Sequence, residues 1–320
     1  MLRLADAVDL YDTGIQRVYT DRFKMDEMNW RKFIKDETTE LYVDTESSFG
    51  GFGQAKILNE NTAVTYVDPD QGFDVAWTQR EFALGFSVTK KLWKFDKKNT
   101  IKKLPAKLAD AILYRIEQDA EDYIYNGAAG STSYSDADGV TVTISGGDGY
   151  ALAYASHTRG DGGTAINNRV YDGTTYNMDL AEDALEAALT YTAPLIVDEK
   201  GNKIAHRYNK ILVPDNLIPT VKRLMLSEGR VGVMDNDVNI HKDEFEIVRL
   251  PQFNSSGTAY YFLLDDAYND LRIKFSQKPI LEGPELIFDT GSFKYKTTAM
   301  YDLRHNDWRA WITSKGTNLT

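Results

Sequence analysis

The longest regular pattern of apolar positions along this chain recurs at helical spacing. Apolar residues follow one another at intervals of four or seven residues, as Leu104, Leu108, Ile112, Ile116 and Tyr123. This spacing places them on one face of an α-helix. We predict a helix over residues 104–126, roughly 30 Å long at 1.5 Å per residue, which ends before Gly127, a typical C-terminal stop.

A polar segment and a two-stranded excursion precede this helix. Residues 1–48 mix charges with scattered aromatic residues and show no continuous apolar face, so we expect an extended arm whose contacts lie on neighbouring molecules. Within residues 49–95, the stretches 63–67 and 86–88 carry β-branched and aromatic residues suited to strands. We therefore expect a long hairpin between the arm and the helix.

Glycine and proline residues lie at the start of this hairpin and between its two limbs. Gly50, Gly51 and Gly53 open it, and Pro69 and Gly72 lie between its two limbs. Glycine adopts backbone conformations that other residues avoid, and proline favours turns. We expect the first three residues to form a hinge and the last two to supply the turn.

Helical and extended patterns alternate after a turn-rich stretch at 127–178. A capping box of Asp179 and Glu182 predicts a helix over 180–191. A buried strand at 210–213 precedes a second helix that starts near Pro214, and we predict further strands at 245–250, 260–264 and 271–275. Residues 293–303 alternate in polarity, which predicts a long half-exposed strand. The block 180–275 thus has an α/β pattern.

The composition limits the classes of protein to which this chain can belong. The chain has 320 residues, 42% of them hydrophobic, and a net charge of −11. That charge argues against a surface devoted to gripping nucleic acid, although it permits enclosure without binding. There is no cysteine, which excludes disulfides and thiolate chemistry. The high aromatic content fits either surfaces that become buried in an assembly or an aromatic-rich core.

A search for catalytic and metal-binding motifs finds none that is convincing. The four histidines (His157, His206, His241, His305) are far apart in sequence, and we expect them at the surface or in loops. Neither a phosphate-binding GxxxxGK[ST] nor a GxSxG nucleophile motif occurs. The spacing from Asp235 to Glu246 matches a calcium loop, but Ile240 stands where the sharp turn needs glycine. We predict no cofactor and no metal.

One basic cluster interrupts the acidic chain. It is interleaved with aromatic residues, and its members include Lys91, Trp93, Lys94 and Lys97. Such a cluster binds either phosphates or the acidic surface of a neighbouring molecule, and a net charge of −11 favours the neighbour. We therefore name these four residues, together with Trp77, as candidate contacts between subunits.

The order of these segments resembles the major capsid proteins of tailed bacteriophages, which have the Hong Kong 97-like fold. This α+β fold implies an N-terminal arm (1–48), an extended β-hairpin loop (49–95) and a peripheral domain (96–179) containing a spine helix (104–126). It further implies an α/β axial domain (180–275) and a return to the peripheral domain (276–320).

The resemblance implies a structural protein and not an enzyme. Many copies would pack as hexamers and pentamers into an icosahedral shell that encloses double-stranded DNA in the virion, assembled in the host cytoplasm. A separate scaffolding protein, a portal and decoration proteins are the further partners, with no membrane involved. Two alternatives remain: an encapsulin-like nanocompartment shell and, from another class, an α/β enzyme.

Covalent reinforcement is a further property of some members of this family, in which a loop lysine is joined to a neighbour's asparagine. Lys56 is the one lysine in the first limb of the excursion. Because no local signature provides the required asparagine and carboxylate, we expect a non-covalent shell.

Overall fold

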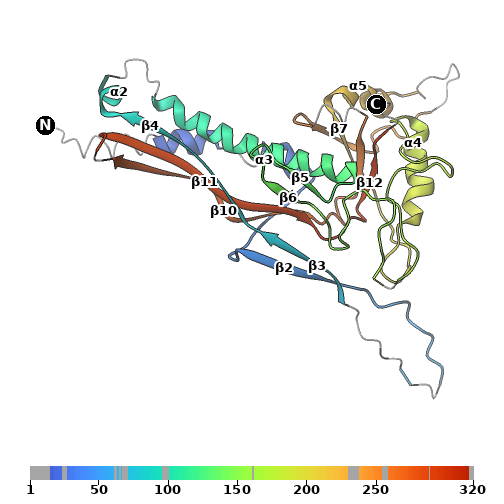
Figure 1. Cartoon of the computed structure of the whole chain (residues 1–320). Coiled ribbons are helices and arrows are strands. Elements are labelled where there is room, and N and C mark those ends of the chain that lie inside the picture. Colours follow the sequence, from blue (N-terminus) through green and yellow to red (C-terminus); the bar gives the residue numbers. More distant parts are fainter. Residues whose placement is uncertain are drawn as a thin grey trace.

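The computed structural model describes residues 15–23, 27–60, 63–64, 66, 71–95, 101–160, 162–229, 238–253, 259–287 and 289–316. The molecule is elongated, as Figure 1 shows. One long helix, α3, lies along a sheet of long strands. A second sheet, with shorter helices, forms one end of the molecule. A hairpin and its connecting segment project below the long sheet.

The long helix α3 (Leu104–Ala129) confirms the strongest sequence prediction and extends beyond it. Gly127 is not the stop: it is helical, and a Cβ there would lie 2.9 Å from the Leu152 Cβ. The C-cap is Gly130, whose φ of 88° is left-handed and therefore favours glycine. A 3-10 turn, η3 (Ile101–Lys103), precedes the helix, and a short helix, α2 (Lys90–Phe95), lies before it in the chain.

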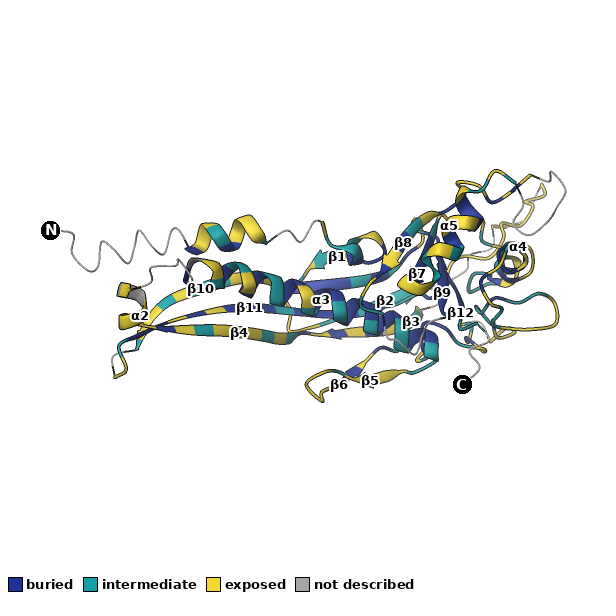
Figure 2. Ribbon diagram, turned by 90° about the horizontal axis from the view of Figure 1, so that it is seen from above, coloured by how far each residue is buried: buried dark blue, intermediate teal, exposed yellow. Residues whose placement is uncertain are grey.

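The long sheet has the strand order β1-β10-β11-β4. Its strands are β1 (Lys35–Thr38), β10 (Leu271–Ile287), β11 (Ser292–His305) and β4 (Arg80–Thr89). β1 runs parallel to β10, whereas β10 with β11 and β11 with β4 are antiparallel. The prediction that 293–303 is half-exposed is wrong, because β11 lies between two strands and most of its residues are buried (Figure 2).

The projecting hairpin has different strands from those that we predicted. β2 (Val43–Phe49) pairs antiparallel with β3 (Gln71–Thr78), so the first limb lies in residues that we assigned to the arm. Residues 63, 64 and 66 are not in a strand. The stretch 86–88 is extended, as expected, but it belongs to β4 in the long sheet.

The described residues of the arm, 15–23 and 27–48, pack within their own subunit, contrary to our expectation. Residues 15–22 are helical, and a 3-10 turn, η2 (Asn29–Lys32), follows. Trp30 and Phe33 are fully buried in the main hydrophobic core, where Trp30 contacts Phe275. Large aromatic side chains gain the most from burial, which explains how scattered aromatic residues fix the arm without a continuous apolar face.

The second sheet has the order β12-β9-β7-β8. It consists of β7 (Lys210–Pro214), β8 (Glu246–Leu250), β9 (Tyr261–Leu264) and β12 (Trp311–Ser314). β7 and β8 are parallel, whereas β9 is antiparallel to β7 and to β12. The strand pairings therefore cross the predicted segment boundaries, since β12 joins this sheet and the start of β10 joins the long one.

Short helices flank the second sheet. α4 (Glu182–Ala187) continues as a π-helical turn, η4 (Ala188–Thr192), and a 3-10 turn, η5 (Ala193–Leu195). Its N-cap is Ala181 without a side-chain cap, so the predicted Asp179 capping box is wrong. A 3-10 turn, η6 (Asp215–Leu217), leads into α5 (Ile218–Leu226), and β5 (Ser133–Ser135) pairs with β6 (Thr141–Thr143) as a small hairpin. None of the described helices has the length and apolarity to span a membrane.

Candidate assembly interface

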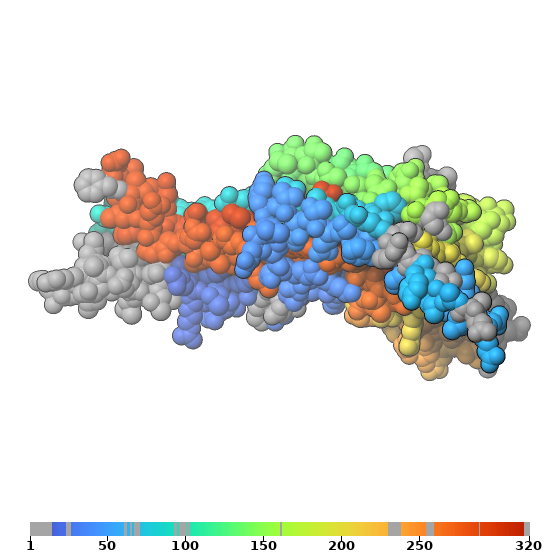
Figure 3. All heavy atoms as spheres, turned by 90° about the horizontal axis from the view of Figure 1, so that it is seen from below, coloured from blue at the N-terminus to red at the C-terminus, as the bar shows by residue number. Residues whose placement is uncertain are grey.

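The segment between β2 and β3 carries apolar side chains that its own subunit leaves uncovered. Ile57 and Tyr66 are each 91% exposed. Phe52, Leu58 and Val64 in the same segment are also exposed, as is Phe49 at the end of β2. In Figure 3, β2 and its neighbours cover the middle of the long sheet, and the described residues that follow β2 extend toward one end. Contiguous exposed apolar side chains mark a surface that another molecule covers.

The predicted hinge glycines lie at the start of this segment. Gly50 is buried, whereas Gly51 and Gly53 are exposed, and a Cβ at either exposed position would meet nothing within 4 Å. Neither has a positive φ, so the conformational reason that we gave for glycine there does not apply.

The two predicted turn residues have different outcomes. Gly72 lies in strand β3 and not in a turn, where a Cβ would come 2.2 Å from Ser48 Oγ. It therefore permits a close approach between β3 and β2. Pro69 lies outside the described residues.

A partly buried cluster of charges, which we call the root cluster, fixes the base of the hairpin to the long sheet. It consists of Lys274 and Arg272 on β10, Glu37 on β1, and Asp44 and Glu46 on β2. Lys274 has a side chain that is 2% exposed, and its Nζ donates to Asp44 Oδ2 at 2.8 Å and also to Glu46. Arg272 donates to Glu46 at 2.8 Å and to Glu37 at 3.2 Å.

Trp77 completes the root cluster. Its ring lies 4.0 Å from Lys274 Nζ and 5.2 Å from Arg272 Cζ, distances at which a cation is attracted to the ring face. Trp77 is fully buried in its own subunit, so we correct its prediction as a contact between subunits. Burial opposes ionisation of Glu46, yet Lys274 and Arg272 hold the pKa of this carboxyl below its ordinary value.

A second group of charged side chains lies beside the root cluster. Arg80, at the start of β4, is within 4 Å of three carboxylates, those of Asp119, Asp136 and Asp302. Asp302 also accepts the backbone N–H of Thr78 at 3.0 Å. Burial raises the pKa of Asp302 and of Asp119. The bond to Thr78 ties β3 to β11 where the hairpin leaves the sheet.

Comparison with known proteins identifies the family. The profile of a family described as phage capsid protein matches residues 71–314. The chain belongs to the phage capsid protein family. No curated protein sequence matches this capsid protein significantly.

Solved structures show the same fold. The capsid protein matches a structure titled "Gordonia phage Cozz" with a TM-score of 0.54 and 11% identity, covering 90% of this chain and 86% of that one. It matches "Capsid structure of the Cyanophage P-SCSP1u" with a TM-score of 0.54 and 11% identity, covering 89% and 86%. A match to "Capsid of empty GTA particle computed with C5 symmetry" has a TM-score of 0.55 and 12% identity, covering 88% and 87%. The fold is therefore the Hong Kong 97-like capsid fold, as predicted.

The predicted basic contacts of this capsid protein lie at and near α2. Lys91 is exposed, Trp93 and Lys94 fall within the helix, and Lys97 lies outside the described residues. Whether these residues contact a neighbour remains a prediction.

The histidine side chains of the capsid protein are buried, so the surface alternative of our expectation is wrong, whereas His157, His206 and His241 do lie outside the helices and strands. His157 Nδ1 donates to the Asp148 carboxylate at 2.6 Å, and the ring stacks on Trp308 with ring centroids 3.8 Å apart. His305 Nδ1 lies 2.6 Å from the Tyr123 hydroxyl on α3. The side chains of His206 and His241 pair with Asp265 and Glu244 and are also buried.

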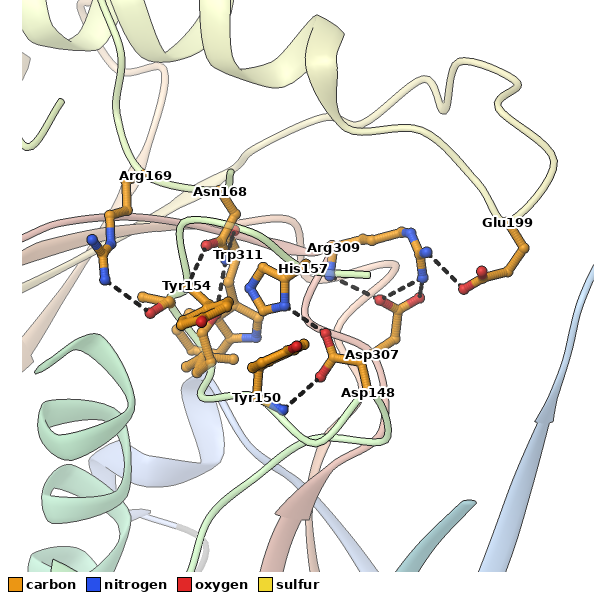
Figure 4. Close-up of polar contacts among 12 residues, drawn as sticks. Asp148, Tyr150, Tyr154, His157, Asn168, Arg169, Glu199, Asp307, Arg309 and Trp311 are labelled. Atoms are coloured by element: carbon orange, nitrogen blue, oxygen red, sulfur yellow. Dashed lines mark hydrogen bonds and ion pairs between the residues drawn. The ribbon is translucent and has the colours of Figure 1, made fainter. Parts of the chain in front are cut away.

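Figure 4 shows how the network around His157 joins the end of the chain to the loops after α3. Arg309 bridges Asp307 and Glu199, while the Asn168 amide donates to the Trp311 carbonyl at 3.1 Å. Burial lowers the pKa of His157, and it lowers the pKa of His305 to about 4. Both rings are therefore neutral near pH 7 and act in packing and hydrogen bonding.

Within the described part of the capsid protein, no group of three or more His, Asp or Glu side chains is placed to hold a metal ion. The first three residues of the calcium-like string, Asp235, Asn236 and Asp237, lie outside the described residues.

Sequence reasoning also missed the root cluster. Its one available signal was the alternation of Arg272 and Lys274 within the otherwise apolar stretch 271–275, which places two cations on one face of β10.

Proposed function

We propose that this capsid protein assembles as hexamers and pentamers into a closed icosahedral shell that encloses double-stranded DNA. One observation carries the proposal: the segment after β2 presents Phe52, Ile57 and Tyr66 to solvent. A single subunit gains nothing from such exposure. In a ring or shell, the projecting segment of each copy lies on the next, which buries these side chains through a repeated heterologous contact.

The charge of the chain supports enclosure without specific binding of DNA. A net charge of −11 keeps the shell wall from adhering to the packaged polyanion. The proposal places the shell in the virion and its assembly in the host cytoplasm. It includes a separate scaffolding protein, a portal and decoration proteins as partners, and it divides the subunit into the arm, loop, peripheral and axial parts named above.

The hinge is also part of the proposal. Gly51 and Gly53 have open space around them and lie just beyond the end of β2. Rotation about these residues would let one sequence reach neighbours at non-equivalent shell positions without disturbing the root cluster.

Expression of the full chain alone tests the proposal. We expect rings, shells or polydisperse large assemblies in negative-stain micrographs and in light scattering. A monomer that persists across concentration and salt would contradict the proposal. DNA that resists nuclease inside purified virions is expected, whereas a protein cargo in native particles would instead indicate a nanocompartment.

The same particles test whether the shell is non-covalent. Lys56 is exposed in the projecting segment, and we expect no bond to a neighbour's asparagine. Boiled particles should give one band near 36 kDa on a denaturing gel. A ladder of multimers that Lys56→Ala removes would show that covalent cross-linking occurs.

A further inference from the structure

The long sheet has two free edges, and one of them carries features that prevent pairing with a further strand. On the first edge, β10 is uncovered over residues 276–287, beyond the end of its pairing with β1. This stretch contains Pro279 and Pro284, and the register of β10 with β11 shifts at three places. Prolines and bulges are common devices that keep a sheet edge from pairing with other chains.

The opposite edge of the long sheet, β4, has none of these devices. Its ten residues pair with β11 without a register shift, and residues 82–88 contain neither a charge nor a proline. In Figure 2, β4 lies along one margin of the long sheet and is mostly exposed. A long, regular and uncharged edge of this kind is where a further strand adds to a sheet.

One hydrogen bond at the end of β4 shows which of its backbone groups face outward. The Lys90 N–H donates to the Gly291 carbonyl at 3.3 Å, which continues the register of β4 with β11. In an antiparallel ladder, every second residue bonds to a given neighbouring strand. The even-numbered residues of β4 therefore bond to β11, whereas Ala83, Gly85 and Ser87 direct their N–H and C=O groups away from the sheet.

An apolar side chain on β4 also lacks cover. Phe82 stacks on Tyr301 and Phe86 stacks on Tyr295, with ring centroids 4.5 and 5.2 Å apart. Leu84 lies between these two stacks on the same face of the sheet, yet it is 51% exposed. Side chains of directly opposite residues on adjacent strands lie about 5 Å apart, so a strand beside β4 would cover Leu84.

The sequence of β4 is suited to pairing with itself. In an antiparallel pair centred on Gly85, Leu84 of each copy lies opposite Phe86 of the other. Phe82 likewise lies opposite Val88, so the large apolar side chains of the ladder face one another. The seven positions 82–88 are then all uncharged on both copies.

Other registers are less favourable. A shift by one residue would place the apolar side chains of the two copies on opposite faces. A shift by two residues would bring Arg80 opposite Val88 in one direction, or Lys90 opposite Phe82 in the other. Each of these shifts sets a charged residue against an apolar one, so the register centred on Gly85 is preferred.

We propose that β4 pairs antiparallel with β4 of a second copy of this chain, with Gly85 of both copies at the centre. The pair joins identical surfaces, so it is isologous and lies on a two-fold axis. The proposal rests on the proposed shell function and adds a contact to it. The heterologous contact of the projecting segment closes rings, whereas the β4 pair joins one ring to the next.

The first test removes a backbone donor from the free edge. Ser87→Pro deletes an outward N–H that β11 does not use, and Ser87→Ala is the matched control that keeps it. Proline is tolerated in edge strands, so the melting temperature of the isolated subunit should stay close to that of the wild type. Because the pair is symmetric, two hydrogen bonds are lost at each contact. We expect the critical concentration for closed shells to rise at least about tenfold, and an unchanged value contradicts the pairing.

The second test reads the register directly, because the natural chain has no cysteine. In the proposed pair, Ala83 of one copy lies opposite Ser87 of the other, with Cα atoms about 5.5 Å apart, a separation that a disulfide spans. Shells mixed from Ala83→Cys subunits and Ser87→Cys subunits should give a disulfide-linked dimer on a non-reducing denaturing gel. Shells of either variant alone should not, because a residue faces its own counterpart there only after a shift of four residues.

The outcomes separate this proposal from the proposed function. If Ser87→Pro weakens assembly but the mixed shells give no dimer, a different strand occupies the edge and the β4 pairing is wrong. Rings or shells that form without the dimer contradict the β4 pairing alone. A wild-type chain that never assembles contradicts the proposed function, and this proposal with it.

Discussion

Two clusters of buried charge in this capsid protein differ in whether opposite charges meet. In the root cluster, Lys274 and Arg272 face the carboxylates of β1 and β2 within one subunit. On α3, Glu117 and Glu121 meet no cation at ion-pair distance in the described part of the chain. A completed cluster fixes two elements of one fold, whereas the acid pair on α3 keeps two carboxyl groups whose pKa burial raises.

Deleting residues 1–48 should have the largest effect on the root cluster of all the changes considered. The deletion removes β1, β2 and the buried Trp30 and Phe33, and it leaves Lys274 buried without its carboxylates. We expect loss of cooperative unfolding, measured by circular dichroism and thermal denaturation. A shortened chain that keeps a sharp, native-like transition would show that the arm is dispensable for folding.

Lys274→Met tests the same cluster with one side chain. Methionine fills the space but leaves Asp44 and Glu46 without their ammonium partner, so we expect a loss of about 3 kcal/mol in the free energy of unfolding. The control is Lys278→Met, whose side chain is half exposed and pairs with Asp36 at 3.6 Å; it should change stability by less than about 1 kcal/mol. Denaturant titration measures both, and equal effects would contradict the role of the root cluster.

Glu121→Gln tests the buried carboxyl pair on α3. Burial and the nearby Glu117 raise the pKa of Glu121 to about 9, well above that of an unfolded glutamate. The folded chain then holds more protons than the unfolded chain between these two pKa values, so this group lowers stability as pH rises. We expect the variant to be more stable than the wild type by more than about 1.4 kcal/mol at pH 9, the equivalent of one pKa unit, and similar to it near pH 4.

Thermal denaturation of the isolated subunit across this pH range measures the difference. Glu186→Gln on α4 serves as the control. A Glu121→Gln variant with the same stability increment at both pH values would show that Glu121 does not titrate within that range.

The smallest effect on folding should come from the predicted hinge. Gly51→Val and Gly53→Val place side chains in open space without a positive φ, so stability should change by less than about 0.5 kcal/mol. If the hinge role is right, shell closure is nevertheless impaired in micrographs. Gly72→Val is the contrasting variant, because its Cβ would collide with Ser48 and weaken β2–β3 pairing. Normal closed shells from the Gly51 and Gly53 variants would contradict the hinge.

Sequence patterns predicted the elements that local periodicity and strong apolar runs determine. The helix α3 and the strands β7 and β9 lie close to their predicted bounds, because each has a regular pattern that is long or fully apolar. The capsid fold followed from the order of these elements and is confirmed.

Features that depend on distant partners could not be predicted. Trp30 looked like part of a loose arm because its contact, Phe275, lies far along the chain. The pairing of β2 with β3 was missed because β2 (Val43–Phe49) is polar and lacks strand-forming runs. The buried histidines were missed because their partners, such as Tyr123 for His305, become neighbours only through the fold.

The long sequence distance between α3 and its partners has a consequence for synthesis. The apolar face of α3 is complete at Ala129, but the strands that pack against its tyrosine and aspartate side chains, through Tyr301 and His305, are made much later. At about 5–20 residues per second, the ribosome needs roughly 7–30 s to reach β10 after finishing α3. During that time the helix and the arm lack their main partner.

The subunit therefore finishes folding only when nearly the whole chain has left the ribosome. Interactions that require long chain separations form slowly, and exposed apolar surface invites aggregation while they form. A chain that stops before Ser292 lacks β11, the strand that joins β10 to β4, so we expect that it cannot complete the long sheet.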